Sequence, residues 1–296
     1  MNTLPEKFPV WGTAMDAMDY VWQRRPLALR FGGIPLAVGM IASWAMLGFK
    51  VSQSEPSVEL FTIAAVQVLI FLAPTVTWYR IVVYGEEEAA RRPVVALGRL
   101  EIRVLLWQIL LLILLIAIAA PLFFIGTWLL IPIATVLKTL GGDALLVGTI
   151  TRGDALVIAV FGPAALGCAF LMLVGGARLS MIVALASLDT PAGFKRAWRV
   201  TRGVAFRMTG ALIVIILAIV LFIALAELLA WLLGMMLAIA ADTGSAEILP
   251  FVRVTAQAVI NLAGLFSMAT LFGFVYKMRA DMAEPAAEPP PSIPVL

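Results

Sequence analysis

Long apolar runs constrain this chain more than any other feature of its sequence. The stretch from Leu105 to Ala120 carries one polar residue, Gln108, and a membrane-crossing helix needs about 20 mainly apolar residues. Hydrophobic residues make up 62% of the 296 residues and charged residues only 13%, which leaves too little polar surface for a protein surrounded by water. We therefore expect an all-α, polytopic transmembrane helical bundle.

Six apolar runs are long enough to cross a bilayer. They predict spans at Leu27–Phe49, Val58–Tyr84, Val104–Ile131, Ala155–Ala177, Met208–Ala240 and Phe251–Tyr276. Residues 1–280 would then form a single six-span domain, in which residues 1–26 precede the first span. Residues 281–296 are proline-rich and predict a tail without a fold of its own.

Glycine and proline interrupt several of these runs. Gly175, Gly176 and Arg178 break the apolar run from Ala155 to Leu188, which is why the fourth span is expected to end at Ala177. Pro74 and Pro163 predict kinks or helix ends, and Pro121 lies in the same way near the end of the third run.

The distribution of basic residues predicts the orientation of the spans. All but four of the 21 Lys and Arg residues fall beside the first span's start, the sixth span's end, or the loops after spans two and four. The four exceptions are Lys50, Lys138, Arg152 and Arg253. Because basic loops stay on the cytoplasmic side, we expect both termini in the cytoplasm.

The segment Phe194–Gly203 has two chemically different sides on a helical wheel. Phe194, Ala197, Trp198 and Thr201 share one side. The bases lie opposite or beside it: Lys195, Arg196, Arg199 and Arg202. Thr190 and Pro191 predict the helix start, and Gly203 predicts its end.

A short helix of this kind suits the bilayer surface, with its bases toward anionic lipid headgroups. An acidic partner, either another membrane protein or a second copy of this chain, would match the same charges. Ordinary enrichment of bases and aromatic residues where helices meet water is the alternative interpretation.

Two further segments precede predicted spans in a similar way. In the N-terminal segment, a stripe of Trp and Met lies opposite a polar stripe. The first stripe contains Trp11, Met15, Met18 and Trp22, and the second Asp16, Asp19 and Gln23. Pro93–Arg103 shows a weaker version, with Arg99 and Arg103 away from its apolar face. These patterns predict three units, each an interfacial helix followed by a transmembrane hairpin.

The residues from Ala177 to Gly210 resemble a signature of bacterial six-span membrane proteins. Arg178, Pro191 and the run Ala197–Gly203 (AWRVTRG) carry the resemblance, and Trp78–Glu86 (WYRIVVYGE) resembles a second element of these proteins. The group includes the membrane domain that accompanies some glycerophosphodiester phosphodiesterases and uncharacterised stand-alone relatives. The resemblance implies a multi-pass protein of the bacterial inner membrane. It implies no phosphodiesterase activity, since that chemistry belongs to a separate soluble domain.

The composition gives no support to an enzyme. The chain has no histidine and a single cysteine, Cys168, so the commonest general base, metal ligand and thiol pair are all missing. Nucleophile and phosphate-binding motifs are also absent from the sequence. We therefore expect no catalytic residues, metal or cofactor, and no nucleic-acid partner, because the bases sit beside apolar runs.

Glu227 is the ionisable residue that lies well inside an apolar run. An intramembrane carboxylate is a default candidate for function, such as proton relay or cation binding. Its distance from Met208, about 28 Å at 1.5 Å per residue, places it toward the outer interface, where it could simply bond to a neighbouring helix. A transporter or channel for a small hydrophobic or lipid-like solute is the alternative function.

Overall fold

The computed structural model describes residues 9–48, 58–87, 98–114, 116–117, 121, 152–239 and 249–279. Regular structure within these residues is entirely helical. The helices are α1 (Val10–Gln23), α2 (Arg25–Gly48), α3 (Val58–Tyr84), α6 (Arg152–Ser187), α7 (Phe194–Val200), α8 (Ala205–Ile239) and α9 (Leu249–Met278). Residues 99–114 form a further helix, here called the 99–114 helix.

Four helices in the described residues are long and apolar enough to cross a membrane, in α2, α6, α8 and α9. Their qualifying segments are Arg25–Trp44, Ala169–Ser187, Ala205–Met236 and Pro250–Met278, and α3 contributes a shorter apolar segment, Leu69–Tyr84. The chain is therefore an all-α protein with the composition of a membrane protein. Most of the third predicted span beyond residue 117 and the tail 281–296 lie outside the described residues.

Helix α9 lies at the centre of the structure, in contact with α1, α2, α3, α6 and α8. Two of its glycines mark close approaches to neighbouring helices. A methyl group at Gly273 would lie 2.5 Å from Cγ1 of Val82 in α3, and one at Gly264 would collide with Ile219 in α8. Small residues allow such close helix packing, which supplies van der Waals contact where lipid offers no hydrophobic drive.

An aromatic cluster fills the core where α1, α3 and α9 meet. The Trp78 ring is fully buried and stacks on Phe266, with ring centroids 4.5 Å apart. Its Nε1–H donates to Oγ1 of Thr270 at 2.9 Å. The Tyr20 ring of α1 packs edge-on against Trp78 and Phe274, so α1 is bound to the end of the bundle by aromatic contacts.

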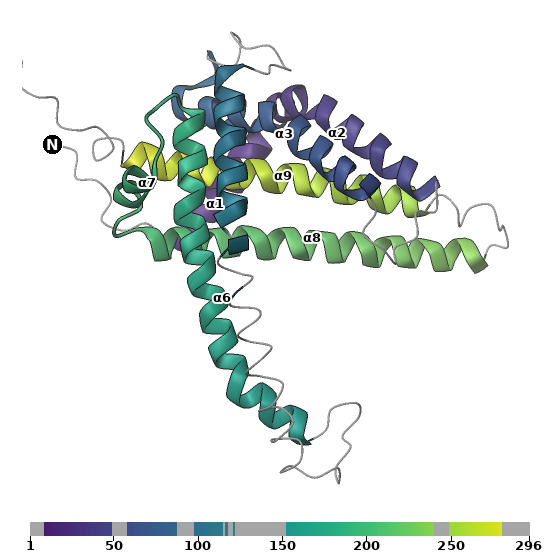
Figure 1. Cartoon of the computed structure of the whole chain (residues 1–296). Coiled ribbons are helices and arrows are strands. Elements are labelled where there is room, and N and C mark those ends of the chain that lie inside the picture. The colour runs from purple at the N-terminus through teal and green to yellow at the C-terminus, as the bar shows by residue number, and fades with distance from the viewer. Residues whose placement is uncertain are drawn as a thin grey trace, which may run out of the picture.

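Helix α6 runs across the other long helices instead of alongside them (Figure 1). It is continuous from Arg152 to Ser187, so the predicted interruption at Gly175 and Gly176 is wrong, and Pro163 does not end the helix. In an apolar environment the backbone has no water with which to bond, and a helix therefore persists through glycine. The residues from Met181 to Leu188, beyond the predicted end at Ala177, are almost wholly buried.

The helix ends that carry most of the bases lie at one end of the molecule. Val82 near the end of α3 meets Gly273 near the end of α9, and Val10 of α1 meets Gly210 near the start of α8. The end of α6 also reaches the end of α3, because the Tyr84 hydroxyl donates to the carbonyl of Leu188 at 3.0 Å. This shared end comprises α1, α7, the ends of α3, α6 and α9, and the starts of α2 and α8. It is called the basic end below.

Candidate functional site

The loop between α6 and α7 sets the position of α7. Asp189 has a left-handed backbone, with φ 58°. The Thr190 N–H donates to the carbonyl of Leu185, and the Asp189 N–H donates to that of Ala186, both at 3.3 Å. These two bonds close α6 in the Schellman arrangement, in which Asp occupies the position usually held by glycine.

The sequence predicted that Thr190 caps the start of α7, and this prediction is wrong. Its hydroxyl donates to the carbonyl of Leu185 at 2.8 Å and so belongs to the end of α6. The residue that precedes α7 is Gly193, which offers no side-chain cap. The prediction failed because one threonine hydroxyl can satisfy a free carbonyl behind it as well as an amide ahead of it.

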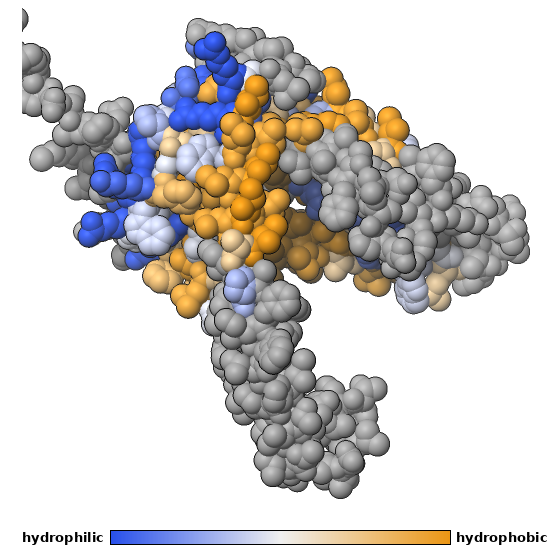
Figure 2. Space-filling model, viewed as in Figure 1, coloured by the Kyte–Doolittle hydropathy of each residue, from blue (hydrophilic) through white to orange (hydrophobic). Residues whose placement is uncertain are grey.

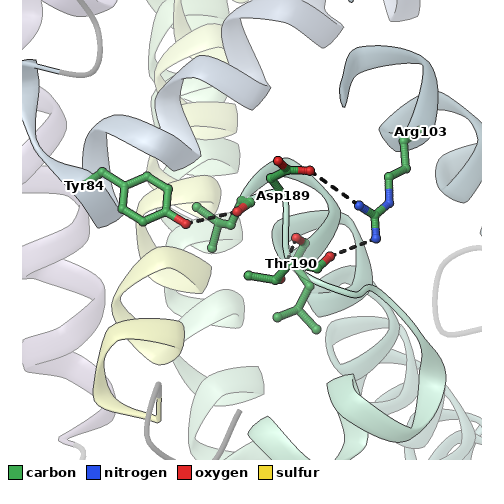
Figure 3. A network of polar contacts seen from close by, with 6 residues as sticks. Tyr84, Arg103, Asp189 and Thr190 are labelled. Atoms are coloured by element: carbon green, nitrogen blue, oxygen red, sulfur yellow. Dashed lines mark hydrogen bonds and ion pairs between the residues drawn. The ribbon is translucent and has the colours of Figure 1, made fainter. Parts of the chain in front are cut away.

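A network of polar contacts ties this loop to two other helices (Figure 3). Arg103 of the 99–114 helix donates to the carbonyl of Thr190 at 2.8 Å and lies 3.7 Å from the carboxylate of Asp189. Tyr84 of α3 binds the carbonyl of Leu188 from the other side. Loop carbonyls that would otherwise lack partners are thereby satisfied, and α7 begins from a fixed point.

Helix α7 has three faces, not two. Ala197, Val200 and Thr201 are buried against the protein, whereas Phe194 and Trp198 remain 44% and 56% exposed. The predicted side that contains Ala197, Thr201 and both aromatic residues is therefore divided between core and surface. The helix ends at Val200, and Gly203 lies in the following turn with φ 80°.

The bases of α7 form the third face. Lys195, Arg199 and Arg202 are exposed and Arg196 is half-buried. Within the described part of the chain, none of the four has an acidic partner. Uncompensated bases beside exposed aromatic rings are the features of a surface that binds anions at a bilayer interface.

Arg178 of α6 extends this basic surface. Its guanidinium carbon lies 4.0 Å from the centre of the Trp198 ring, a cation–π contact. The buried Nε atoms of Arg178 and Arg196 have no acceptor among the described residues. Arg279, at the end of α9, has Nη2 3.7 Å from the position of a Cβ on Gly203. Arg178 of α6 and Arg279, which follows α9, therefore lie beside the bases of α7.

Hydrophilic side chains collect at the end of the molecule where α7 lies, and apolar side chains cover the adjoining helices (Figure 2). Many large apolar residues of α8 are exposed, among them Leu217, Leu221 and Phe222. This separation places the α7 surface at the junction between an apolar belt and a charged end. The surface made by Phe194, Lys195, Arg196, Trp198, Arg199 and Arg202 is called the α7 surface below.

Helix α1 repeats the three-faced layout with the opposite charge. Thr13, Ala14, Ala17 and Val21 are buried. Trp11, Met15 and Trp22 are exposed on one part of the surface, and Asp16, Asp19 and Gln23 on another. The predicted Trp and Met stripe therefore faces outward, apart from Met18, which packs partly against the core.

The end of α1 is fixed to the residues that follow α3. Nε of Arg24 donates to the Glu86 carboxylate at 2.8 Å, and its guanidinium carbon lies 3.9 Å from the centre of the Tyr20 ring. Burial raises the pKa of the Tyr20 hydroxyl above its ordinary value; the Arg24 charge opposes this shift and the Glu86 charge adds to it. Glu86, the first of three consecutive glutamates, is thus paired with Arg24.

Glu227 is engaged by two side chains of α9. Nε2 of Gln257 donates to one carboxylate oxygen at 2.8 Å, and Nε of Arg253 lies 3.2 Å from the other. Both partners of the ion pair retain about two-fifths exposure, with side chains 41% exposed for Arg253 and 38% for Glu227. This geometry fits a structural link between α8 and α9, the simpler of the two sequence interpretations.

Of the third predicted segment, residues 99–103 lie on the 99–114 helix, Gly98 directly precedes this helix, and residues 93–97 lie outside the described residues. The carboxylate of Glu101 accepts the N–H of Gly98 at 2.9 Å, half of a capping box. Glu101 and Val104 are buried, whereas Arg99 is exposed. The roles of Tyr84, Arg103 and Asp189 could not be predicted from local sequence patterns, because they depend on contacts between distant parts of the chain.

No cluster of three or more metal-binding side chains occurs among the residues that the structure describes. Comparison with family models, curated proteins and solved structures finds no match to the chain. The resemblance to six-span bacterial membrane proteins therefore stays a prediction. The α7 surface, with its position at the basic end, is the best-defined candidate site.

Proposed function

We propose that this chain is a non-enzymatic, multi-pass protein of the bacterial inner membrane that binds anionic lipid headgroups through the α7 surface. In this proposal the six predicted spans cross the bilayer and both termini are cytoplasmic. Trp198 anchors α7 at the interface, and Lys195, Arg196, Arg199 and Arg202 supply the charge.

The observation that carries the proposal is the exposed Trp198 ring beside bases without acidic partners in the described part of the chain. Such bases near an anionic bilayer each contribute about 1 kcal/mol. Four of them would supply about 4 kcal/mol before salt screening reduces the attraction. Anionic lipid is a better match than an acidic protein because the face of α7 next to the bases exposes the aromatic side chains of Phe194 and Trp198.

Lipid enrichment around the reconstituted protein tests the proposal. The full chain is incorporated into vesicles of equal phosphatidylglycerol and phosphatidylcholine, re-extracted in mild detergent, and its retained lipid is quantified by mass spectrometry. The wild type should retain more phosphatidylglycerol than phosphatidylcholine, and less so at high salt. A variant with Lys195, Arg199 and Arg202 changed to Gln should lose most of this preference.

The matched control changes Lys50, Lys138 and Arg152 to Gln. It removes the same number of positive charges from the predicted opposite side of the membrane and should retain the preference. An unchanged preference in the α7 variant, or an equal loss in the control, would refute headgroup binding by the α7 surface.

A further inference from the structure

A hollow of about 350 Å³ lies against the 99–114 helix. Its lining combines two bases at one end with apolar side chains along the rest. The lining residues are Arg99, Ile102, Arg103, Leu106, Trp107 and Leu110. They recur every three or four positions and therefore share one face of the helix.

The apolar part of this groove is exposed and elongated. Ile102, Leu106 and Leu110 are each more than two-fifths exposed. From residue 99 to residue 110 the helix rises about 16 Å, at 1.5 Å per residue. A linear hydrocarbon chain laid along this face would cover these side chains.

The charged end of the groove contains two guanidinium groups, those of Arg99 and Arg103, that can bind an anion. Arg99 is exposed and has no acidic partner among the described residues. Arg103 is held in place by the Thr190 carbonyl, and the Asp189 carboxylate at 3.7 Å offsets part of its charge. The carboxylate of Glu101, on the same helix, is buried and accepts the Gly98 N–H.

We propose that this groove holds a single anionic phospholipid, with its phosphate at Arg99 and Arg103 and one acyl chain along Ile102, Leu106 and Leu110. Charge complementarity selects the headgroup, and the apolar length selects a lipid over a free phosphate ion. Trp107 joins this groove to the α7 surface, because its ring packs edge-on against Phe194 at 5.8 Å. The proposal requires the membrane location proposed above but does not require the bases of α7 to bind lipid.

Native mass spectrometry of the full chain in detergent tests the groove by counting bound lipids during titration. The wild type should retain one phosphatidylglycerol more tightly than any phosphatidylcholine, and glycerol phosphate alone should not displace it. Arg99→Gln should weaken this binding roughly fivefold, the factor that corresponds to about 1 kcal/mol per base at a membrane surface.

Two further variants separate the groove from general electrostatics. Leu106→Trp fills the apolar part without changing charge and should also weaken the bound lipid. Asp189→Asn keeps a residue that tolerates the left-handed backbone but removes the competing carboxylate, so affinity should rise roughly twofold, within the range for an exposed ion pair.

Changing Lys195, Arg199 and Arg202 to Gln should leave the single bound lipid in place, even where it abolishes the wider preference for phosphatidylglycerol. Retention unchanged by both Arg99→Gln and Leu106→Trp would overturn the groove proposal while the α7 result stood. Equal retention of phosphatidylcholine, or displacement by glycerol phosphate at the same concentration, would overturn it as well.

Discussion

Trp78 and Trp198 are the same residue type in two different environments, one in the packed core and one at the surface. The Trp78 ring is fully buried, stacks on Phe266 and donates a hydrogen bond to Thr270. The Trp198 ring is 56% exposed and faces the guanidinium of Arg178. Both rings carry an indole N–H: that of Trp78 donates to Thr270, whereas that of Trp198 has no acceptor among the residues that the structure describes.

Trp78→Phe should therefore lower the stability of the protein by about 2 kcal/mol, since it removes a buried hydrogen bond and leaves a void. Thermal unfolding of the purified protein in detergent, followed by circular dichroism, measures the effect. Trp198→Phe makes the same chemical change at the surface and should leave the unfolding temperature nearly unchanged. Equal losses at both positions would show that the two environments do not differ in this way.

At the scale of helices, some glycines lie where a neighbouring helix approaches closely, and others face no neighbouring helix. Gly273 faces Val82 of α3, whereas a methyl group at Gly175 in α6 would meet no atom within 4 Å outside its own helix backbone. Alanine stabilises a helix by up to about 1 kcal/mol relative to glycine where no contact opposes it. The two glycines should therefore respond to the same substitution with opposite signs.

We expect Gly175→Ala to raise the unfolding temperature and Gly273→Ala to lower it. At Gly273 the added methyl must displace Val82, and overpacking typically costs about 1–3 kcal/mol. The same detergent unfolding experiment measures both variants. A second substitution, Val82→Ala, should rescue Gly273→Ala in part; without that rescue, the α3–α9 contact is not the cause.

The link between α8 and α9 at Glu227 gives a third expectation. Glu227→Gln and Arg253→Gln should each destabilise the protein slightly, and the double variant should lose less than the sum. The coupling should be about 0.5 kcal/mol, because both side chains are substantially exposed. Detergent unfolding of the four proteins measures it, and exact additivity would contradict the ion pair.

Much of the helical content could be predicted from apolar runs, because lipid obliges every such run to satisfy its own backbone. Helix α3 spans the same residues as the second predicted span, Val58–Tyr84. The continuation of α6 through Gly175 could not be predicted from the helix propensity of glycine, because that propensity is measured in water and a backbone surrounded by apolar groups has no water to bond with. Its direction across the bundle depends on contacts between distant residues, which no local pattern contains.

The third faces of α1 and α7 could not be predicted for a different reason. Ala14, Ala17 and Ala197 contribute little to a hydropathy pattern, so a helical wheel does not separate the buried side of either helix from its exposed aromatic residues. The small size of these alanines is what permits a close approach between helices. Lys195, Arg199 and Arg202 of α7 are exposed and Arg196 is half-buried, whereas the Arg103–Asp189–Thr190 network could not be predicted without the fold.

For the whole molecule, the helix ends that meet at the basic end fit a chain that crosses the membrane back and forth. The direction of α6 does not follow this pattern. The starts of α2 and α8 and the ends of α3 and α9 meet at the basic end, as alternating spans would require. Helix α6 also ends there but runs across the bundle (Figure 1). The decisive position is the segment between the third and fourth predicted spans, because only six spans place it outside.

Cysteine accessibility tests this arrangement in a Cys168→Ala background. Single cysteines replace Ser54, Gly142 and Ser245 on the predicted outer side, or Thr3, Glu87 and Ser292 on the predicted inner side. In spheroplasts, a membrane-impermeant maleimide should label the first set directly and the second only after permeabilisation, since the bases hold the inner loops in the cytoplasm. Labelling at position 142 only after permeabilisation would mean that α6 and the 99–114 helix do not cross the membrane. The protein would then have four spans, and these two helices would lie on its cytoplasmic side.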